Sequence, residues 1–528
     1  MPSSARNAIS IVAYAALLVS TGWLLDQLAQ HQFTAHLRDQ AAHALMLAAT
    51  GDTPYRWQLR NSDDIVAGRV FGAGDMHFSD GELIVRSSGA VFEIGLPLAR
   101  AVDLRRFPHL QISLDADAAS DLRVVTREKL ESPELISGLT SVNPGANTLQ
   151  LDLAASGWSS GTHEVAPPRY AAMLRLRVTL PAGKQLRLRA VALDRIEGTQ
   201  RIDLTQLPHI VDSEASTAAG TAIIRIPFNS QLQKMDIDAI EKNSDARKPL
   251  LIALPQHGRV EQQIALRNAI FAAGPSTILI PEDVLQASFT QARDEAAAPP
   301  AATASPWRWM WLAAYALILG YFRLRPTPAP RLRALVEIVL TLAAPLWLIV
   351  GGRFDGNPDA VQKVLIVLSL TYAISLSVPK TWHWNGSVRA WLLAAAVVLF
   401  AALLGFIAHQ PDAAMRTIGT GHIARYLAWA LLQQYLICAV CTERWRIVTG
   451  NTAIAAYLGA LGFALMHTPN AALMLATLLG GLCWCALYLR ERALLPLAAS
   501  HAASALILLT LLPADILASA EVSARFFQ

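Results

Sequence analysis

Two histidines, His467 and His501, interrupt apolar sequence near the end of this chain. An imidazole in hydrocarbon is costly, so it needs a polar partner or a function there. A third interruption, Gln433-Gln434, lies inside the apolar run from Leu427 to Val440. Imidazoles act as general bases or hydrogen-bond donors, and an amide oxygen can orient a water molecule. We therefore expect one buried polar site built from three neighbouring membrane helices.

Each of these residues also has a purely structural interpretation. Gln433 and Gln434 would serve equally well as bridges between helices, an interaction of about 0.6 to 2 kcal/mol apiece in membranes. His467 falls near one end of its apolar run, where an interfacial histidine needs no role, whereas His501 falls near the middle of its run. The middle position favours function, and the three together favour a shared pocket.

The composition indicates a membrane protein with a separate soluble part. The chain has 528 residues, of which 53% are hydrophobic and 16% charged, and its mean hydropathy is +0.35. Such values are typical of several membrane spans, and the length predicts at least two domains. The net charge of +4 is small, and the basic residues of the C-terminal half cluster in short loops. This is an orientation signal, so we expect the lipid bilayer and no nucleic acid as partner.

All four cysteines fall within or at the end of apolar runs, so the soluble part has no disulfide. A metal site is conceivable because Cys438 and Cys441 lie three apart on one helix. Small buried packing residues are the favoured interpretation for all of them: Cys438, Cys441, Cys483 and Cys485.

The first apolar run, 8–25, follows Arg6 and predicts an uncleaved signal anchor. Arg6 would keep residues 1–7 in the cytoplasm, and residues 26–306 would be exported. Leu37 to Thr50 is expected to form a separate short amphipathic helix. The exported part is divided into a β-sandwich over 26–200, a small α/β segment over 201–295 and an Ala- and Pro-rich linker over 296–306.

Period-two alternation between Tyr55 and Glu197, as in Leu174-Arg-Leu-Arg-Val178, predicts the antiparallel sandwich. The pattern resembles a jelly roll of the carbohydrate-binding, galactose-binding-like type, which implies a glycan as a possible partner. A spacer or protein-docking module explains the same pattern. The α/β segment is predicted from strand and helix candidates: Leu250–Leu254, Thr277–Ile280, Met235–Ile240 and Val260–Ala272.

Eight further spans are expected within a membrane domain over 307–514, followed by an exported tail over 515–528. The spans are Trp309–Phe322, Leu335–Val350, Val364–Val378, Trp391–Ile407, Ala424–Val440, Ala453–Met466, Ala471–Leu489 and Leu494–Leu512. Alternate loops between them carry the arginines and lysines. Their positive charge predicts that these loops lie on the cytoplasmic side of a bacterial inner membrane, in agreement with the orientation predicted from Arg6.

Phe463-xxx-His467, the following Thr-Pro-Asn470 and the later His501 resemble the CPBP (Abi, CAAX prenyl protease type) intramembrane proteases over 424–512. That family's pattern is Glu-Glu-xxx-Arg, then Phe-xxx-His, then His-xxx-Asn. The resemblance implies that the first acidic position activates water and that the histidines position it and stabilise the oxyanion. It leaves a divalent metal cofactor open.

The chain departs from this pattern at several positions. Gln433-Gln434 replace the glutamate pair, Cys438 stands at the arginine position, and Ala505 stands where asparagine is common. An amide cannot accept a proton near neutral pH, so a buried histidine would have to be the base. Arg444 lies eleven residues past Gln433, which at about 100° per residue is nearly the same helix face. It would either replace the missing arginine or simply anchor the cytoplasmic end of the helix.

We therefore expect an inner-membrane endopeptidase that cuts a membrane-associated peptide or protein recognised by the exported sandwich. The catalytic candidates are His467, His501, Gln433 and Gln434; the substrate-binding candidates are Phe463, Asn470 and Arg444; no metal ligand is assigned. One alternative is an inactive relative that binds a peptide, lipid or glycan as a receptor or assembly factor. Another is an accessory protein of polysaccharide export or synthesis.

Overall fold

The protein is described from a computed structural model that divides into two compact units. One unit comprises residues 1–36, 259–264 and 300–528, and the other comprises 37–258 and 265–299. The residues described are 3–199, 201–204, 222–225, 240, 250–254, 259–274, 276–297, 307–325, 328–351, 354, 358–376, 383–409, 420–513, 516–517 and 519–527.

The N-terminal helix α1 runs without a break from Ser3 to Thr50. The expectation of a separate short helix from Leu37 was therefore wrong. No glycine or proline lies between Leu25 and Leu37, so nothing in the sequence interrupts the helix. It ends at Gly51, whose φ of 84° suits glycine at a helix C-terminus.

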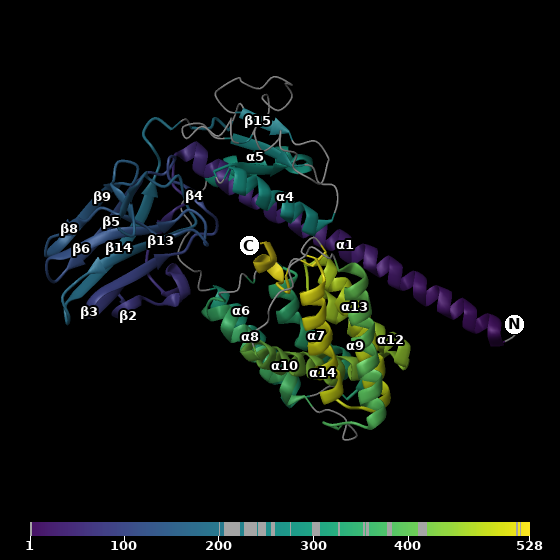
Figure 1. Ribbon diagram of the computed structural model, residues 1–528. Coiled ribbons are helices and arrows are strands. Elements are labelled where there is room, and N and C mark those ends of the chain that lie inside the picture. The colour runs from purple at the N-terminus through teal and green to yellow at the C-terminus, as the bar shows by residue number, and fades with distance from the viewer. Residues whose placement is uncertain are drawn as a thin grey trace. The chain divides into compact units, whose positions relative to one another are not determined.

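The β-sandwich predicted from the period-two alternation is confirmed (Figure 1). Its strands are β1 (Arg56–Trp57), β2 (Phe71–Ser79), β3 (Glu82–Leu96), β4 (Val102–Asp103), β5 (His109–Ala116), β6 (Ser120–Arg127), β7 (Leu135–Ser137), β8 (Thr140–Val142), β9 (Gly145–Asp152), β10 (Trp158–Ser160), β11 (His163–Val165), β12 (Tyr170–Ala171), β13 (Met173–Thr179) and β14 (Gln185–Asp194). All pairings among them are antiparallel.

Strand β3 connects the two layers of the sandwich. Its first part, 83–86, pairs with β14, and its second part, 91–96, pairs with β13. Between them, a Cβ at Gly89 would lie 2.7 Å from the Cβ of Ala73 on β2, so the close approach of β2 favours glycine there. The side chains that face inward along both halves, such as Leu83 and Phe92, are fully buried in one apolar core.

The small α/β segment contains a three-stranded parallel sheet, β15 (Ala222–Arg225), β16 (Leu250–Leu254) and β17 (Ile278–Pro281). Helices α4 (Val260–Ala273) and α5 (Leu285–Ala297) accompany it. Every residue of β16 is buried, as expected for a central parallel strand. The expected helix Met235–Ile240, except Ile240, and most of the expected linker lie outside the described residues.

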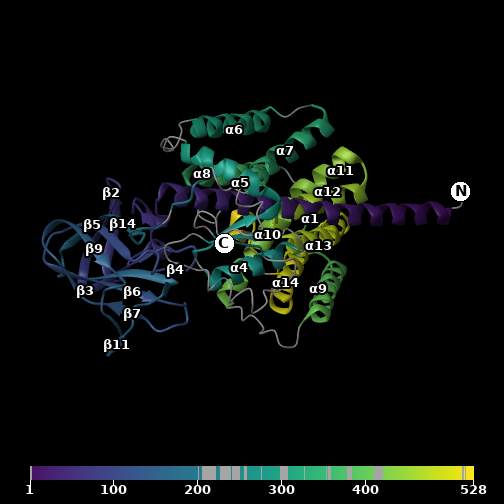
Figure 2. The ribbon, with the colours of Figure 1, turned by 90° about the horizontal axis from the view of Figure 1, so that it is seen from above.

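The other unit is helical, and each expected span overlaps one of its helices. These are α6 (Trp307–Leu324), α7 (Pro330–Ile349), α8 (Ala360–Ser375), α9 (Val388–Ala408), α10 (Thr420–Gln434), the π-helical stretch η5 (Tyr435–Thr442), α11 (Glu443–Thr449), α12 (Thr452–Leu465), α13 (Ala471–Glu491) and α14 (Leu495–Leu511). Among the described residues, five helices, α1 included, are long and apolar enough to cross a membrane, and three apolar helices are shorter. Helices α9, α13 and α14 lie side by side (Figure 2).

Candidate active site

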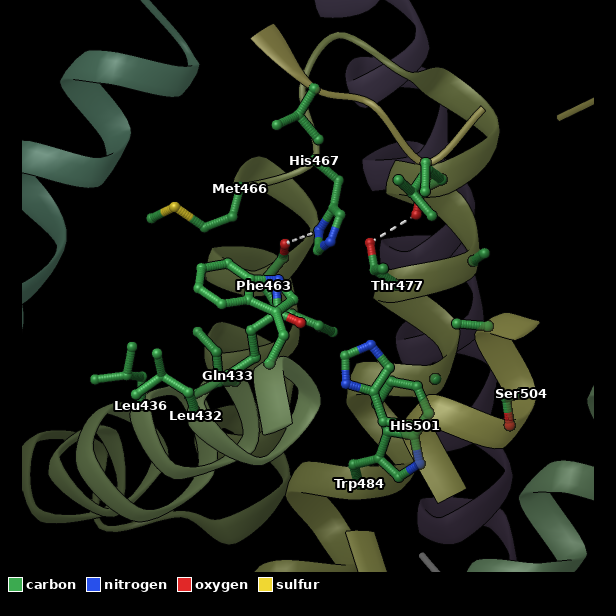
Figure 3. Close-up of a pocket in the computed structure, with 18 of the residues that line it drawn as sticks. Leu432, Gln433, Leu436, Phe463, Met466, His467, Thr477, Trp484, His501 and Ser504 are labelled. Carbon is green, nitrogen blue, oxygen red and sulfur yellow. Dashed lines mark hydrogen bonds between the residues drawn. The ribbon is translucent and has the colours of Figure 1, made fainter. Parts of the chain in front are cut away.

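A cavity of about 640 Å³ lies within the helical unit, between α7, α8, α9, α10, α12, α13 and α14. Most of its lining is apolar, but several polar side chains reach it: Gln433, His467, Thr477, His501 and Ser504. Figure 3 shows both imidazoles directed into this space, with Phe463 and Thr477 beside them. The structure thus brings the two predicted histidines to one cavity.

His467 is held by the last turn of the apolar helix α12. Its Nδ1 lies 2.8 Å from the carbonyl oxygen of Phe463, four residues earlier. A carbonyl oxygen only accepts hydrogen bonds, so Nδ1 of the neutral ring carries the proton and donates it. Nε2 of His467 is therefore left as a hydrogen-bond acceptor and a potential base.

His501 is held in the opposite tautomer by Gln434. The thiol of Cys438 donates to Oε1 of Gln434 (3.1 Å), which turns the amide nitrogen toward Nδ1 of His501 (3.3 Å). The amide nitrogen can only donate, so Nδ1 accepts and Nε2 of the neutral ring carries the proton. His501 therefore offers a donor, in contrast to His467.

Aromatic side chains fix the two imidazoles in place. The ring of Phe463 lies edge-on to both, with centroid distances of 4.8 Å to His467 and 5.4 Å to His501. The indole of Trp484 packs on His501 at 4.7 Å. Its Nε1 donates to the hydroxyl of Ser500 (3.1 Å), which in turn donates to the carbonyl oxygen of Ala394 (2.9 Å). These contacts preorganise the ring orientations.

The predicted glutamine pair is divided between two positions. Gln433 lines the cavity, whereas Gln434 is 1% exposed and meets the cavity only through His501. Among the described residues that line the cavity, none is aspartate or glutamate. The described part of the chain thus brings no carboxylate to the site, and the proton acceptors there are imidazole nitrogens.

Asn470 and Arg444 do not line the cavity. Asn470 caps α13, because its Oδ1 accepts from the amide of Leu473 (3.1 Å). Arg444 forms a buried ion pair with Glu337 of α7 at 2.6 Å. The prediction that Gln433 and Arg444 share a helix face assumed a regular α-helix. The π-helical stretch between them changes the number of residues per turn, so that assumption does not hold.

Sequence reasoning missed Ser504 and the segment Ser519–Phe527. Ser504 lies one turn after His501, is 4% exposed, and its hydroxyl has no hydrogen-bond partner among the described residues. Its spacing from His501 places it on the same helix face, which was a usable signal. Ala520 and Val522 also line the cavity, and no motif in the sequence indicates this.

The residues present do not fit a bound divalent metal. No group of three His, Cys, Asp or Glu side chains gathers closely enough in the part of the chain that the structure describes. A catalytic metal usually takes three protein ligands, which the described lining of the cavity does not bring together. We therefore assign the chemistry of this cavity to its side chains.

Comparison with known families agrees with this architecture. Residues 423–507 match the family of type II CAAX prenyl endopeptidases, Rce1-like. The match begins in α10 and ends in α14, so it contains both histidines and the glutamine pair. The resemblance inferred from the sequence is confirmed: the C-terminal helical region is similar to this family over residues 423–507.

No curated protein matches the chain. Among solved structures, a family 29 carbohydrate-binding module is 8% identical and covers 23% of this chain and 76% of its own, with a TM-score of 0.17. A family 11 carbohydrate-binding module from Clostridium thermocellum is 7% identical and covers 24% of this chain and 85% of its own, with a TM-score of 0.19. The structure of PfGH50B is 11% identical and covers 35% of this chain and 28% of its own, with a TM-score of 0.20. Similarity at this level does not indicate a ligand.

Proposed function

We propose that the helical unit is an intramembrane endopeptidase that hydrolyses a peptide bond of a membrane-associated peptide or protein. One observation carries this proposal. Two imidazoles face the same cavity in complementary tautomers, one with an accepting nitrogen and the other with a donating N–H. Hydrolysis of an amide needs both, because a proton must leave water while negative charge develops on the carbonyl oxygen.

In the proposed reaction, the amide oxygen of Gln433 orients a water molecule toward the scissile carbonyl carbon. Nε2 of His467 accepts a proton from this water as its oxygen bonds to the carbon. The Nε2–H of His501 stabilises the resulting oxyanion. The C–N bond then breaks, and His467 returns the proton to the leaving amine, which gives one new carboxyl group and one new amino group.

Gln434 acts as a positioning residue in this scheme. Its orientation depends on the Cys438 thiol, and it sets the tautomer of His501 through a buried contact. A glutamate at this position would accept from Nδ1 of His501 and leave Nε2 without a proton. Gln434→Glu is therefore expected to lower cleavage about 10²-fold, the scale measured for loss of one oxyanion donor.

The remaining parts of the proposal concern location and substrate supply. We place the protein in a bacterial inner membrane with residues 26–306 exported and 515–528 on the same side, on the charge distribution of its loops. The sandwich would then present a substrate protein to the helical unit. A glycan is a further possible ligand of the sandwich, by its jelly-roll pattern alone.

The central test compares new N-termini in the membrane proteome of cells that express the wild type, His467→Ala or His501→Ala. Both variants should lose wild-type-dependent cleavage by about 10²-fold or more at equal membrane abundance. His409→Ala is the matched control, because its Nδ1 also contacts a backbone carbonyl, that of Leu511 (3.0 Å), outside the cavity lining. Unchanged cleavage by either cavity variant would refute the assigned roles.

A second candidate function is an inactive receptor that binds a peptide or lipid in the same cavity. The absence of a carboxylate among the described lining residues favours it. Gln433→Glu separates the two, since it supplies a stronger proton acceptor at the position that faces the cavity. Cleavage by the wild type supports histidine-based hydrolysis, whereas cleavage by the Gln433→Glu variant alone identifies a binding protein.

A further inference from the structure

The segment Ser519–Phe527 packs over the end of the cavity that contains His467. Ala520 and Val522 line the cavity itself. The side-chain amide of Asn470 donates to the carbonyl oxygen of Ser519 at 2.7 Å, and the backbone N–H of Ser523 donates to the carbonyl oxygen of Thr468 at 2.7 Å. The segment is therefore bound to the loop that directly follows His467.

These contacts are directed at main-chain atoms of the segment. Asn470 also approaches a second carbonyl oxygen, that of Glu521, at 3.4 Å. Its Oδ1 is already used to cap α13, so Nδ2 is free to donate to a peptide. Contacts to main-chain atoms do not depend on side-chain identity, which is how peptide-binding sites commonly accept many sequences.

The two ends of the segment are held very differently. Residues Ser519 to Val522 are half-buried or exposed, whereas Phe526 and Phe527 are each 5% exposed. The ring of Phe527 stacks on His36 of α1 at 4.3 Å and lies 5.7 Å from the ring of Phe33. The aromatic end can therefore stay anchored while the part over the cavity lifts.

We infer that Ser519–Val522 occupies a peptide-binding subsite at the mouth of the cavity and closes it until a substrate peptide displaces it. The substrate backbone would then accept from the Nδ2 donor of Asn470, which lies three residues after His467. The inference rests on the proposed function for its ligand class. It gives Asn470, predicted from the sequence as a substrate-binding residue, a specific contact at the entrance of the cavity.

The first test is binding of a labelled synthetic peptide with the sequence of residues 516–528 to purified protein in detergent. A variant that lacks residues 519–528 should bind it at least tenfold more tightly than the full chain, whose subsite is filled. A scrambled peptide reports non-specific binding. Equal binding by the two proteins, or no binding by a deletion variant that is folded, would overturn the inference.

A second variant covers the case in which the deletion variant does not fold. Phe527→Ala loosens the anchor and leaves the backbone contacts in place, so the peptide should compete with the resident segment and bind more tightly than to the wild type. Binding no tighter than to the wild type contradicts displacement. In the same variant, any cleavage activity should rise severalfold.

Asn470→Asp tests the named contact within the deletion or Phe527→Ala background. Aspartate keeps the helix cap but cannot donate to a carbonyl, so peptide affinity should fall about tenfold. Asn451→Asp is the matched control, because Asn451 caps α12 in the same way and has no contact with the segment. An equal loss in both variants would argue against the subsite.

The binding and cleavage measurements also separate the two proposals. Displaceable binding without cleavage by any variant would keep the subsite and reject the endopeptidase. Cleavage that depends on both histidines, without displaceable binding, would keep the endopeptidase and reject the subsite.

Discussion

The interiors of the β-sandwich and of the helical unit differ in the kinds of side chain that they bury. Inward residues along the sandwich strands, such as Phe92 and Leu176, form a continuous apolar core. The helical unit instead buries an amide, an imidazole and an ion pair, at Gln434, His501 and Arg444. Burial of apolar side chains is the main stabilising term in the first interior, although it also buries the paired carboxylate of Asp103. The polar groups in the second are costly unless they are paired, and Gln434 and His501 are paired with each other beside the cavity.

The largest expected effect comes from breaking the sandwich core. Phe92→Ala should lower the free energy of unfolding by about 3 to 5 kcal/mol, because its fully buried ring leaves a cavity. Its neighbour Val91 is 42% exposed, so Val91→Ala should cost about 0.5 kcal/mol or less. Thermal unfolding combined with limited proteolysis of the full chain measures both. Equal costs would show that the sandwich does not depend on this core.

A slightly smaller effect is expected from the buried ion pair of the helical unit. Arg444→Ala removes the buried partner of Glu337 and leaves it only the more exposed Arg333 at 2.9 Å, so it should cost about 2 to 3 kcal/mol. The pair of Arg308 with Asp359 is exposed, so Arg308→Ala should cost less than about 1 kcal/mol. Unfolding in detergent compares them. A cost for Arg444→Ala as small as that of Arg308→Ala would remove the proposed difference between buried and exposed charges.

A still smaller loss of stability is expected from breaking the hydrogen-bond chain next to His501. Ser500→Ala leaves the indole N–H of Trp484 and the carbonyl of Ala394 without their shared partner, at about 1 to 2 kcal/mol. Thr510→Ala is the control, because that hydroxyl only bonds carbonyls of its own helix. If Trp484 positions His501, Ser500→Ala should also reduce cleavage severalfold. Full activity of Ser500→Ala would show that these hydrogen bonds contribute only to packing.

The smallest effect is expected on the outer face of the sandwich. Glu93 pairs with Arg175 (3.0 Å) and Arg177 (2.6 Å), which are all partly exposed. Glu93→Gln should cost less than about 1 kcal/mol, and the cost should shrink in 1 M salt because the charges are screened. Unfolding at low and high salt measures this. A large, salt-independent loss would mean that this face, too, depends on a buried polar network.

Local pattern was sufficient to predict much of the fold. Alternation such as Leu174-Arg-Leu-Arg-Val178 identified strands, and long apolar runs identified the helices, because both periods follow from backbone geometry. The break expected before Leu37 failed, since amphipathic and apolar stretches can share one helix. The π-helical stretch Tyr435–Thr442 was not foreseeable, because several residue patterns fit an α-helix equally well.

The residue types at the candidate site were visible in the sequence, but their roles were not. An imidazole in an apolar run predicts a buried polar group wherever it packs, so His467 and His501 stood out from composition alone. Which nitrogen of His501 carries the proton depends on Gln434, which is 67 residues away in the chain. The approach of Ser519 to Asn470 likewise joins segments far apart in sequence. Such contacts arise only when separate helices pack together, and so the tertiary structure alone decides which group accepts a proton, which donates one, and which segment closes the cavity.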